Sequence, residues 1–220
     1  MTGKLKDQLD ALATELGTPQ QVTDLITREL AAETMASAPG LRVGDEAPDF
    51  ELPYPTGRRV RLSTVLRQKP VALSFYRGEW CPYCNLELRA WQHRFDDVAA
   101  AGGQFLAITP QRPSNALSLT ERHALKYPVL SDLDQEAIRA YRVRYDLPPT
   151  LKDLYANTFA VDLTTQNADG CWSLTVPATF VISEQHRVRF AYAHLDWRVR
   201  AEPADVLAVL REEASLDKRR

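Results

Sequence analysis

The segment FYRGEWCPYCNLEL, Phe75–Leu88, holds two of the chain's three cysteines, separated by a proline and a tyrosine. The wholly apolar run 71–76 predicts a buried strand that enters this segment. Pro82 suits the first position of a helix, which makes Cys81 the predicted N-cap residue. The segment therefore predicts a strand that passes through a short loop into a helix, with both cysteines at the helix start.

Helix geometry makes Cys81 the predicted nucleophile. The positive potential of a helix N-terminus stabilises a thiolate and lowers its pKa below the ~8.5 of a free cysteine. Cys84 lies one turn further along the same face, within reach of a disulfide. Apolar residues follow Cys84 at helical spacing and predict that this sulfur is the more buried one; they are Leu88, Trp91, Phe95 and Val98. We interpret the pair as a redox dithiol.

Two other interpretations of the pair are an inert helix start and half of a zinc site. A zinc site needs two more ligands, and the sequence has no second CxxC. The remaining candidates are scattered: Cys171, His93, His123, His186 and His194. No glycine-rich phosphate loop is present. We therefore expect neither a metal nor a cofactor.

The composition fits an enzyme-sized domain with an appendage. The chain has 220 residues, 45% of them hydrophobic, and a net charge of −2, so no basic face suggests a nucleic-acid partner. No apolar run approaches ~18 residues, and the charged N-terminus has no signal-peptide core, so we expect a cytoplasmic protein with no membrane partner. Thiols stay reduced there, which favours a catalytic pair over a structural disulfide.

Periodicity predicts an N-terminal helical extension over residues 1–36, broken at Gly17, and a linker from Ala36 to Gly40. The extension could be an arm that binds a second copy or a partner, or two helices that pack on their own domain. The domain itself is predicted over 41–213. Its predicted strands are 71–76, 105–108, 127–130, 179–182 and 188–192, and its predicted helices are 82–101, 114–125, 133–142 and one starting at 202–203. This order predicts an α/β fold of three layers around a central mixed sheet.

Three segments together resemble the peroxiredoxin-like family, the alkyl hydroperoxide reductase and thiol-specific antioxidant group. They are GDEAPDFEL (Gly44–Leu52), the cysteine segment itself and VPATFVIS (Val176–Ser183). The resemblance implies a thioredoxin-like fold. In the family's register Cys84 takes the peroxidatic position, and Glu87 matches a glutamate three residues later. Arg77, Cys81 and Pro177 stand where the family has proline, threonine and the peroxide-binding arginine.

The segment WCPYC also resembles the WCxxC motif of thioredoxins. That resemblance makes Cys81 the nucleophile and aligns Pro177 with the proline that is cis in thioredoxins and faces the cysteine pair. Which sulfur attacks first is therefore open.

Several neighbours of the pair have two interpretations. Arg77 could lower a thiolate pKa or contact a peroxide, or it could be a solvated loop cation. Arg198 and Arg200 could supply the missing positive charge, although solvated side chains are the expectation. Trp80 is expected at the rim of the site. Cys171 could be a third thiol, although we expect a small, partly buried packing residue.

The leading functional hypothesis is reduction of hydroperoxides through a Cys81/Cys84 dithiol–disulfide cycle, renewed by a thioredoxin-type dithiol reductant. One alternative is a thioredoxin-like reductase of protein disulfides, with Cys81 as nucleophile. Another is a non-enzymatic, redox-sensing binding protein. A homodimer is compatible with the sequence.

Overall fold

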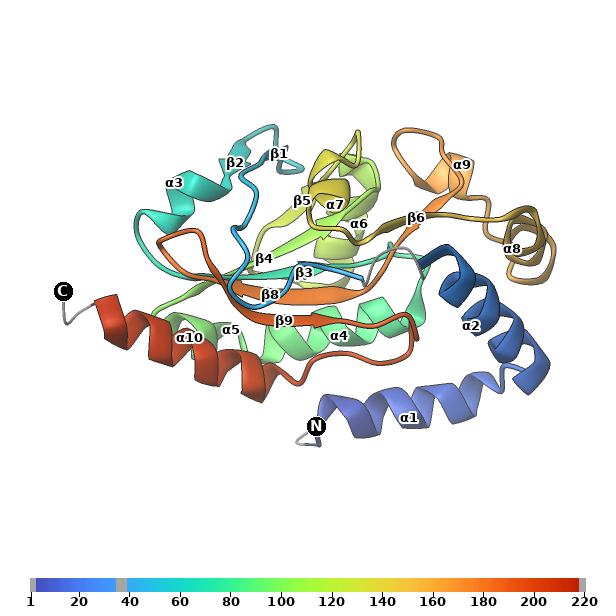
Figure 1. The fold of residues 1–220 in the computed structure, drawn as a ribbon, viewed down its shortest axis with the longest axis horizontal. Coiled ribbons are helices and arrows are strands. Elements are labelled where there is room, and N and C mark those ends of the chain that lie inside the picture. The colour runs from blue at the N-terminus through green and yellow to red at the C-terminus, as the bar shows by residue number, and fades with distance from the viewer. Residues whose placement is uncertain (1–2, 35–38, 218–220) are drawn as a thin grey trace.

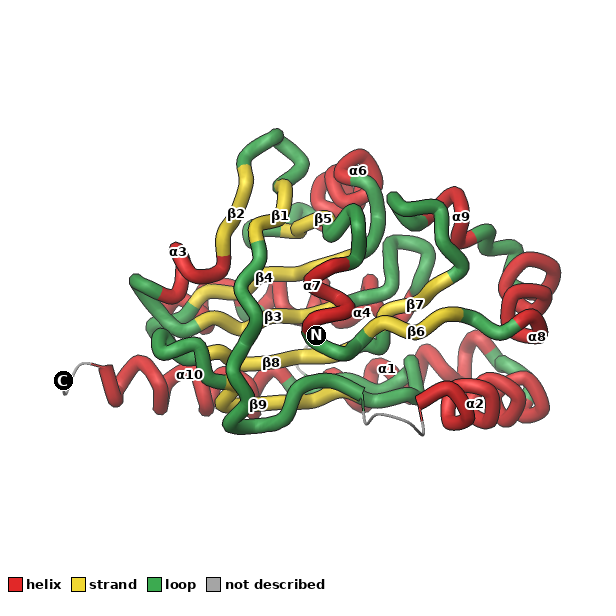
Figure 2. The backbone as a smooth tube through the Cα atoms, turned by 45° about the horizontal axis from the view of Figure 1, so that its top comes forward, coloured by secondary structure: helices red, strands yellow, loops and turns green. Residues whose placement is uncertain are grey.

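The computed structural model describes residues 3–34 and 39–217, which fold around a mixed β-sheet (Figures 1 and 2). Within these residues five strands form the sheet, in the order β5-β4-β3-β8-β9. Their bounds are Val129–Ser131, Gln104–Thr109, Val71–Phe75, Ala178–Ile182 and Val188–Ala193. The pairs β3–β4 and β4–β5 are parallel, whereas β3–β8 and β8–β9 are antiparallel. The central strand β3 is fully buried, as its apolar sequence predicts.

Helices cover both faces of this sheet (Figure 1). One face carries α4 (Pro82–His93), α5 (Phe95–Ala100) and α10 (Pro203–Asp217), and the other side carries α6 (Pro113–His123) and α7 (Glu136–Ala140). The predicted α/β architecture of three layers with a mixed central sheet is confirmed. No helix in the described part of the chain has the length and apolar character needed to cross a membrane.

The predicted single helix over 82–101 is wrong, because the helix breaks at Arg94 (φ −104°, ψ 9°) into α4 and α5. The segment Gly44–Leu52, which resembles the family's entry strand, forms a regular strand only at its end, in β1 (Glu51–Pro53). The sequence predicts none of the other short elements. These are β2 (Arg59–Arg61), α3 (Leu62–Leu66), β6 (Arg144–Asp146), α8 (Pro149–Asp153), the π-helical turn η1 (Leu154–Thr158), α9 (Leu163–Gln166) and β7 (Ser173–Thr175). Each is too short to show a helical or strand period clearly.

The N-terminal helices α1 (Leu5–Leu16) and α2 (Gln20–Thr34) pack on the rest of the fold, α1 beneath α4 in Figure 1. Their apolar stripes join the main core through Leu5, Leu9, Ile26 and Leu30. The Glu202 carboxylate accepts hydrogen bonds from the backbone N–H groups of Leu5 (3.1 Å) and Lys6 (2.7 Å). These contacts agree with helices that pack on their own domain. The boundaries 1–36 and 41–213 stay predictions, and most of the predicted linker lies outside the described residues.

Substitution Leu9→Ala should lower the free energy of unfolding by about 2–5 kcal/mol, because it leaves a cavity where α1 meets the core. Leu9 is 3% exposed, whereas Leu16 in the same helix is 47% exposed. The control variant Leu16→Ala should therefore change the unfolding free energy by only about 0.5 kcal/mol. Urea denaturation followed by circular dichroism measures both values. Equal losses for the two variants would contradict the docking of α1 on the core.

Candidate active site

The cysteine segment lies where β3 leaves the centre of the sheet. After Phe75 the chain passes through a short loop, and Pro82 begins α4 with Cys81 as its N-cap residue (φ −94°, ψ 111°). The extended backbone at Cys81 and the proline in the first turn are the local preferences of a helix start. The prediction from the sequence is confirmed, and both sulfurs lie at the N-terminus of α4.

Both cysteines are free and buried, Cys81 with 2% and Cys84 with 0% of its surface exposed. Cys84 is the more buried sulfur, as predicted, although Cys81 also has very little exposed surface. However, Cys81 lines a cavity of about 470 Å³, whereas Cys84 does not. The stripe after Cys84 faces the core as predicted, since Leu88, Trp91 and Val98 are buried and Phe95 packs against them. Access to the pair is thus through Cys81.

The two sulfurs have opposite pKa shifts. Burial alone would raise the pKa of Cys81. The hydrogen bond from the Cys84 thiol, the charges of Arg77 and Arg200, and the Cys84 N–H outweigh burial and lower this pKa to about 5. Burial is also the main cause that raises the pKa of Cys84, followed by its hydrogen bond to Cys81 and the negative charge there. The arrangement therefore favours a thiolate at Cys81 and a thiol at Cys84.

Arg200 lies beneath the pair, so its predicted solvated position is wrong. Its Nη2 donates to the Cys84 Sγ at 3.2 Å, and its Nε donates to Glu87 Oε2 at 2.5 Å. The side chains of Arg200 and Glu87 are both 1% exposed. Backbone carbonyls of Trp197 and Val199 accept from Nη1 at 2.6 and 2.7 Å, and the Ser74 hydroxyl donates to the other Glu87 oxygen at 3.0 Å. These partners explain how the charge can be buried.

Arg77 is also buried, with 3% exposure, and the solvated interpretation of this residue is wrong. Its guanidinium carbon lies over the rings of Trp80 (4.9 Å), Tyr155 (5.4 Å) and Trp197 (6.0 Å). It donates a hydrogen bond to the Tyr155 hydroxyl, while its Nε has no partner. Both Arg77 and the predicted rim residue Trp80 line the cavity. No motif marks Tyr155 or Trp197 in the sequence, because they meet Arg77 only through the tertiary fold.

Three other sequence predictions are corrected. Pro177 is buried between β7 and β8, and its peptide bond is trans, so the predicted cis bond is wrong. Cys171 is exposed rather than packed, and its thiol lies 3.8 Å from the Asp169 carbonyl oxygen. Arg198 is partly buried and pairs with Asp196 at 2.8 Å. None of these three residues lines the cavity at Cys81.

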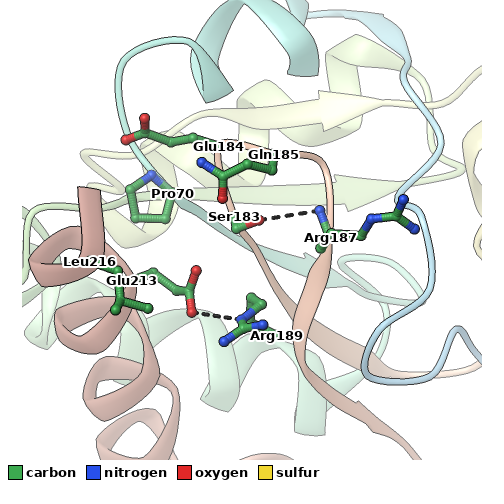
Figure 3. A pocket seen from close by; sticks show the side chains of 8 residues that line it. All are labelled: Pro70, Ser183, Glu184, Gln185, Arg187, Arg189, Glu213 and Leu216. Atoms are coloured by element: carbon green, nitrogen blue, oxygen red, sulfur yellow. Dashed lines mark hydrogen bonds and ion pairs between the residues drawn. The ribbon is translucent and has the colours of Figure 1, made fainter. Parts of the chain in front are cut away.

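Figure 3 shows another cavity, of about 260 Å³, between the β8–β9 turn and the end of α10. An ion pair between Arg189 Nε and Glu213 Oε1 (2.7 Å) lies in its wall. No cysteine lines this cavity, nor does any of the other residues predicted for the site. Three of the residues predicted for the site therefore line the cavity at Cys81, namely Cys81, Arg77 and Trp80. The other three, Cys84, Glu87 and Pro177, are buried and do not line it.

The lowered pKa of Cys81 predicts a measurable pH profile. In a Cys171→Ser background, alkylation of Cys81 by iodoacetamide should already be at its plateau at neutral pH. It should fall only as the pH approaches about 5, where the thiolate becomes protonated. Cys84→Ala removes a hydrogen-bond donor to the thiolate, so the inflection should move to higher pH. An inflection near the ~8.5 of a free cysteine in the parent protein would contradict the geometry.

Arg200→Met should lower the free energy of unfolding by about 3–5 kcal/mol, because it leaves the Glu87 charge buried and unpaired. The double variant Arg200→Met, Glu87→Leu should recover most of the loss. Arg198→Met is the matched control on a more exposed pair, and it should cost no more than about 1 kcal/mol. Urea denaturation distinguishes these outcomes. A cost for Arg200→Met no larger than for Arg198→Met would show that the buried pair contributes little.

Comparison with known proteins agrees with the fold. The model of the AhpC/TSA family matches residues 43–191, more than half of the chain. A putative peroxiredoxin of Mycobacterium tuberculosis is 29% identical over 131 residues, covering 58% of this chain and 83% of the relative. Peroxiredoxin Bcp of Escherichia coli K12 is 29% identical over 103 residues, which cover 47% of this chain and 65% of the relative.

Among solved structures, peroxidoxin BcpB from Mycobacterium tuberculosis superposes with a TM-score of 0.62 at 24% identity, over 78% of this chain and 97% of its own. The bacterioferritin comigratory protein of Xanthomonas campestris superposes with a TM-score of 0.57 at 18% identity, and the match covers 75% of this chain and 92% of that protein. These likenesses establish the thioredoxin-like fold. The family match shows that this chain belongs to the AhpC/TSA family of peroxiredoxins.

Proposed function

We propose that this protein is a thiol peroxidase that reduces hydroperoxides through a Cys81/Cys84 cycle, with Cys81 as the attacking sulfur. The observation that carries the proposal is the asymmetry of the pair. Cys81 alone lines the cavity and has its pKa lowered, while Cys84 is fully buried with a raised pKa. Family membership supports a hydroperoxide as the substrate.

In the first step the Cys81 thiolate attacks the distal oxygen of the hydroperoxide, and the O–O bond breaks. Cys81 becomes a sulfenic acid, and the leaving oxygen departs as an alcohol, or as water from hydrogen peroxide, once it takes up a proton. The Cys84 thiol then attacks the Cys81 sulfur and expels water, which forms the Cys81–Cys84 disulfide. A dithiol reductant of the thioredoxin type returns both cysteines to thiols and is itself oxidised to a disulfide.

Two arginines supply the positive charge that the family pattern places elsewhere. The position of the family's arginine holds Pro177, which is buried and does not line the cavity. Arg77 reaches the cavity from the loop before Cys81, and Arg200 donates a hydrogen bond to the Cys84 sulfur. In our proposal both stabilise the thiolate, and Arg77 also faces the developing negative charge on the leaving oxygen. Glu87 positions Arg200, and Trp80 encloses Arg77.

Reduction of protein disulfides is the second candidate, because Cys81 at a helix start would also be its nucleophile. The 2% exposure of Cys81 and the walls of the cavity favour a small substrate instead. A redox-sensing binding protein would need the apolar faces of α1 and α2 to be open, whereas Leu5, Leu9 and Ile26 are buried. The thioredoxin-type reductant, a homodimer and a cytoplasmic location stay predictions.

Turnover of hydrogen peroxide and of an organic hydroperoxide should be lost in Cys81→Ser, because no thiolate faces the cavity. Cys84→Ser should still consume one equivalent of hydroperoxide and stop as a Cys81 sulfenic acid, which dimedone traps and mass spectrometry locates. Cys171→Ser is the matched control and should keep full turnover. Dimedone labelling at Cys84 in Cys81→Ser would reverse the assignment. Insulin reduction without peroxide turnover would favour the second candidate.

A further inference from the structure

The turn between the two N-terminal helices closes one side of the cavity in front of Cys81. Gly17 ends α1 in the left-handed conformation (φ 56°), and the chain turns into α2 within three residues. We call Leu16–Val22 the α1–α2 corner. Four residues of this corner line the cavity, namely Leu16, Thr18, Pro19 and Val22. Leu16 is 47% exposed although it is a large apolar residue, so it is available to a ligand.

The residues that line the cavity combine one polar, reactive region with a largely apolar remainder. The reactive end holds Cys81 and the guanidinium of Arg77, whose Nε is unpartnered although the side chain is buried. The rest of the described lining is mostly aromatic and aliphatic; it includes two threonines, Thr18 and Thr158, and no carboxylate. Three of its aromatic residues, Trp80, Tyr155 and Trp197, surround the Arg77 guanidinium, and Tyr83 and Phe159 complete the aromatic lining. Such a site suits a ligand with one polar end and an apolar body.

The size of the cavity also suits a ligand with an organic body. Its volume is about 470 Å³, within the range of roughly 300–1,000 Å³ found for sites that hold small organic ligands. Hydrogen peroxide is close in size to water, which occupies about 30 Å³ in the liquid, so it would leave most of the cavity unfilled. The apolar wall is unnecessary for such a substrate. An organic body beside the hydroperoxide group would contact it.

The α1–α2 corner is held in place by the packing of the two helices on the rest of the fold. Leu9 in α1 and Ile26 in α2 are 3% and 1% exposed, and Glu202 binds the first turn of α1. On the other side, the Thr150 hydroxyl donates to Glu29 of α2 at 2.9 Å. The wall is therefore preformed, which reduces the entropic cost of binding a ligand against it.

We infer that the α1–α2 corner determines substrate specificity by binding the apolar organic body of a hydroperoxide whose O–O bond lies at Cys81. This inference rests on the proposed peroxidase function and adds the residues that would favour organic hydroperoxides over hydrogen peroxide. The corner precedes the family match, which begins at residue 43. Selection would thus come from a part of the chain outside the family segment.

The test compares cumene hydroperoxide, which carries an aromatic body, with hydrogen peroxide. The readout is the ratio of their kcat/KM values in the full chain and in Leu16→Ser and Val22→Ser. Each variant should lower this ratio about tenfold, mainly through the KM for cumene hydroperoxide. Leu216→Ser is the matched control, since Leu216 is 44% exposed and lines the cavity of Figure 3. It should leave the ratio unchanged. Equal ratios in the full chain and both corner variants would overturn the inference.

A second measurement separates this inference from the proposed function. Cumyl alcohol, the product of cumene hydroperoxide, should protect Cys81 of the full chain from alkylation, and higher concentrations should be needed in the corner variants. If the full chain reduces no hydroperoxide but this protection holds, the proposed function fails and the binding role of the corner stands. Absence of protection in the full chain would overturn the corner's role whatever the turnover.

Discussion

The buried guanidinium of Arg200 is the interaction on which the arrangement of the site depends. A charge that is almost completely removed from water is tolerated only when its hydrogen bonds are satisfied. Here one carboxylate, two backbone carbonyls and one sulfur accept from it. These partners tie the loop before α10 to the first two turns of α4, under both cysteines. This contact gives the Cys84 sulfur a hydrogen-bond donor, and its charge adds to that of Arg77 in lowering the pKa of Cys81.

The helix start then separates the roles of two chemically identical side chains. Cys81, at the N-cap, faces the free N–H groups of α4 and the charge of Arg77, and it reaches the cavity. Cys84, one turn later, faces the core and donates to the other sulfur. Attack on a hydroperoxide needs a thiolate, and resolution needs a neighbouring thiol. The pair therefore offers both groups at neutral pH, although the family register places the peroxidatic cysteine at Cys84.

Local features of this site could be predicted from the sequence, and long-range ones could not. The apolar run before the motif and Pro82 determine β3, the start of α4 and the N-cap at Cys81, because these depend on neighbours in the chain. The helix period also identified the buried face of Cys84.

The long-range features of the site could not be predicted in this way. The burial of Arg200 depends on Glu87, 113 residues away in the chain, and an arginine in a loop is expected to be solvated when only its neighbours are considered. Tyr155 lies in a short π-helical turn with no periodic signal. The trans bond at Pro177 shows that the WCxxC motif can occur within a thioredoxin-like fold without the cis proline that faces it in thioredoxins.

Arg77 connects the two halves of the proposed cycle. Arginine keeps its charge at every physiological pH, and here it lies among three aromatic rings with its Nε unpartnered. In the reduced state of the proposed cycle, the Cys81 thiolate would balance this charge. The disulfide removes the thiolate, so the same cation then faces the cavity without an anion. An incoming reductant thiolate would restore the balance, and attack on the Cys81 sulfur is the approach that brings it there. The charge that lowers the pKa of Cys81 would therefore also favour reduction of the disulfide. A cation buried beside the pair can serve both steps without moving, which an exposed and screened arginine could do only weakly.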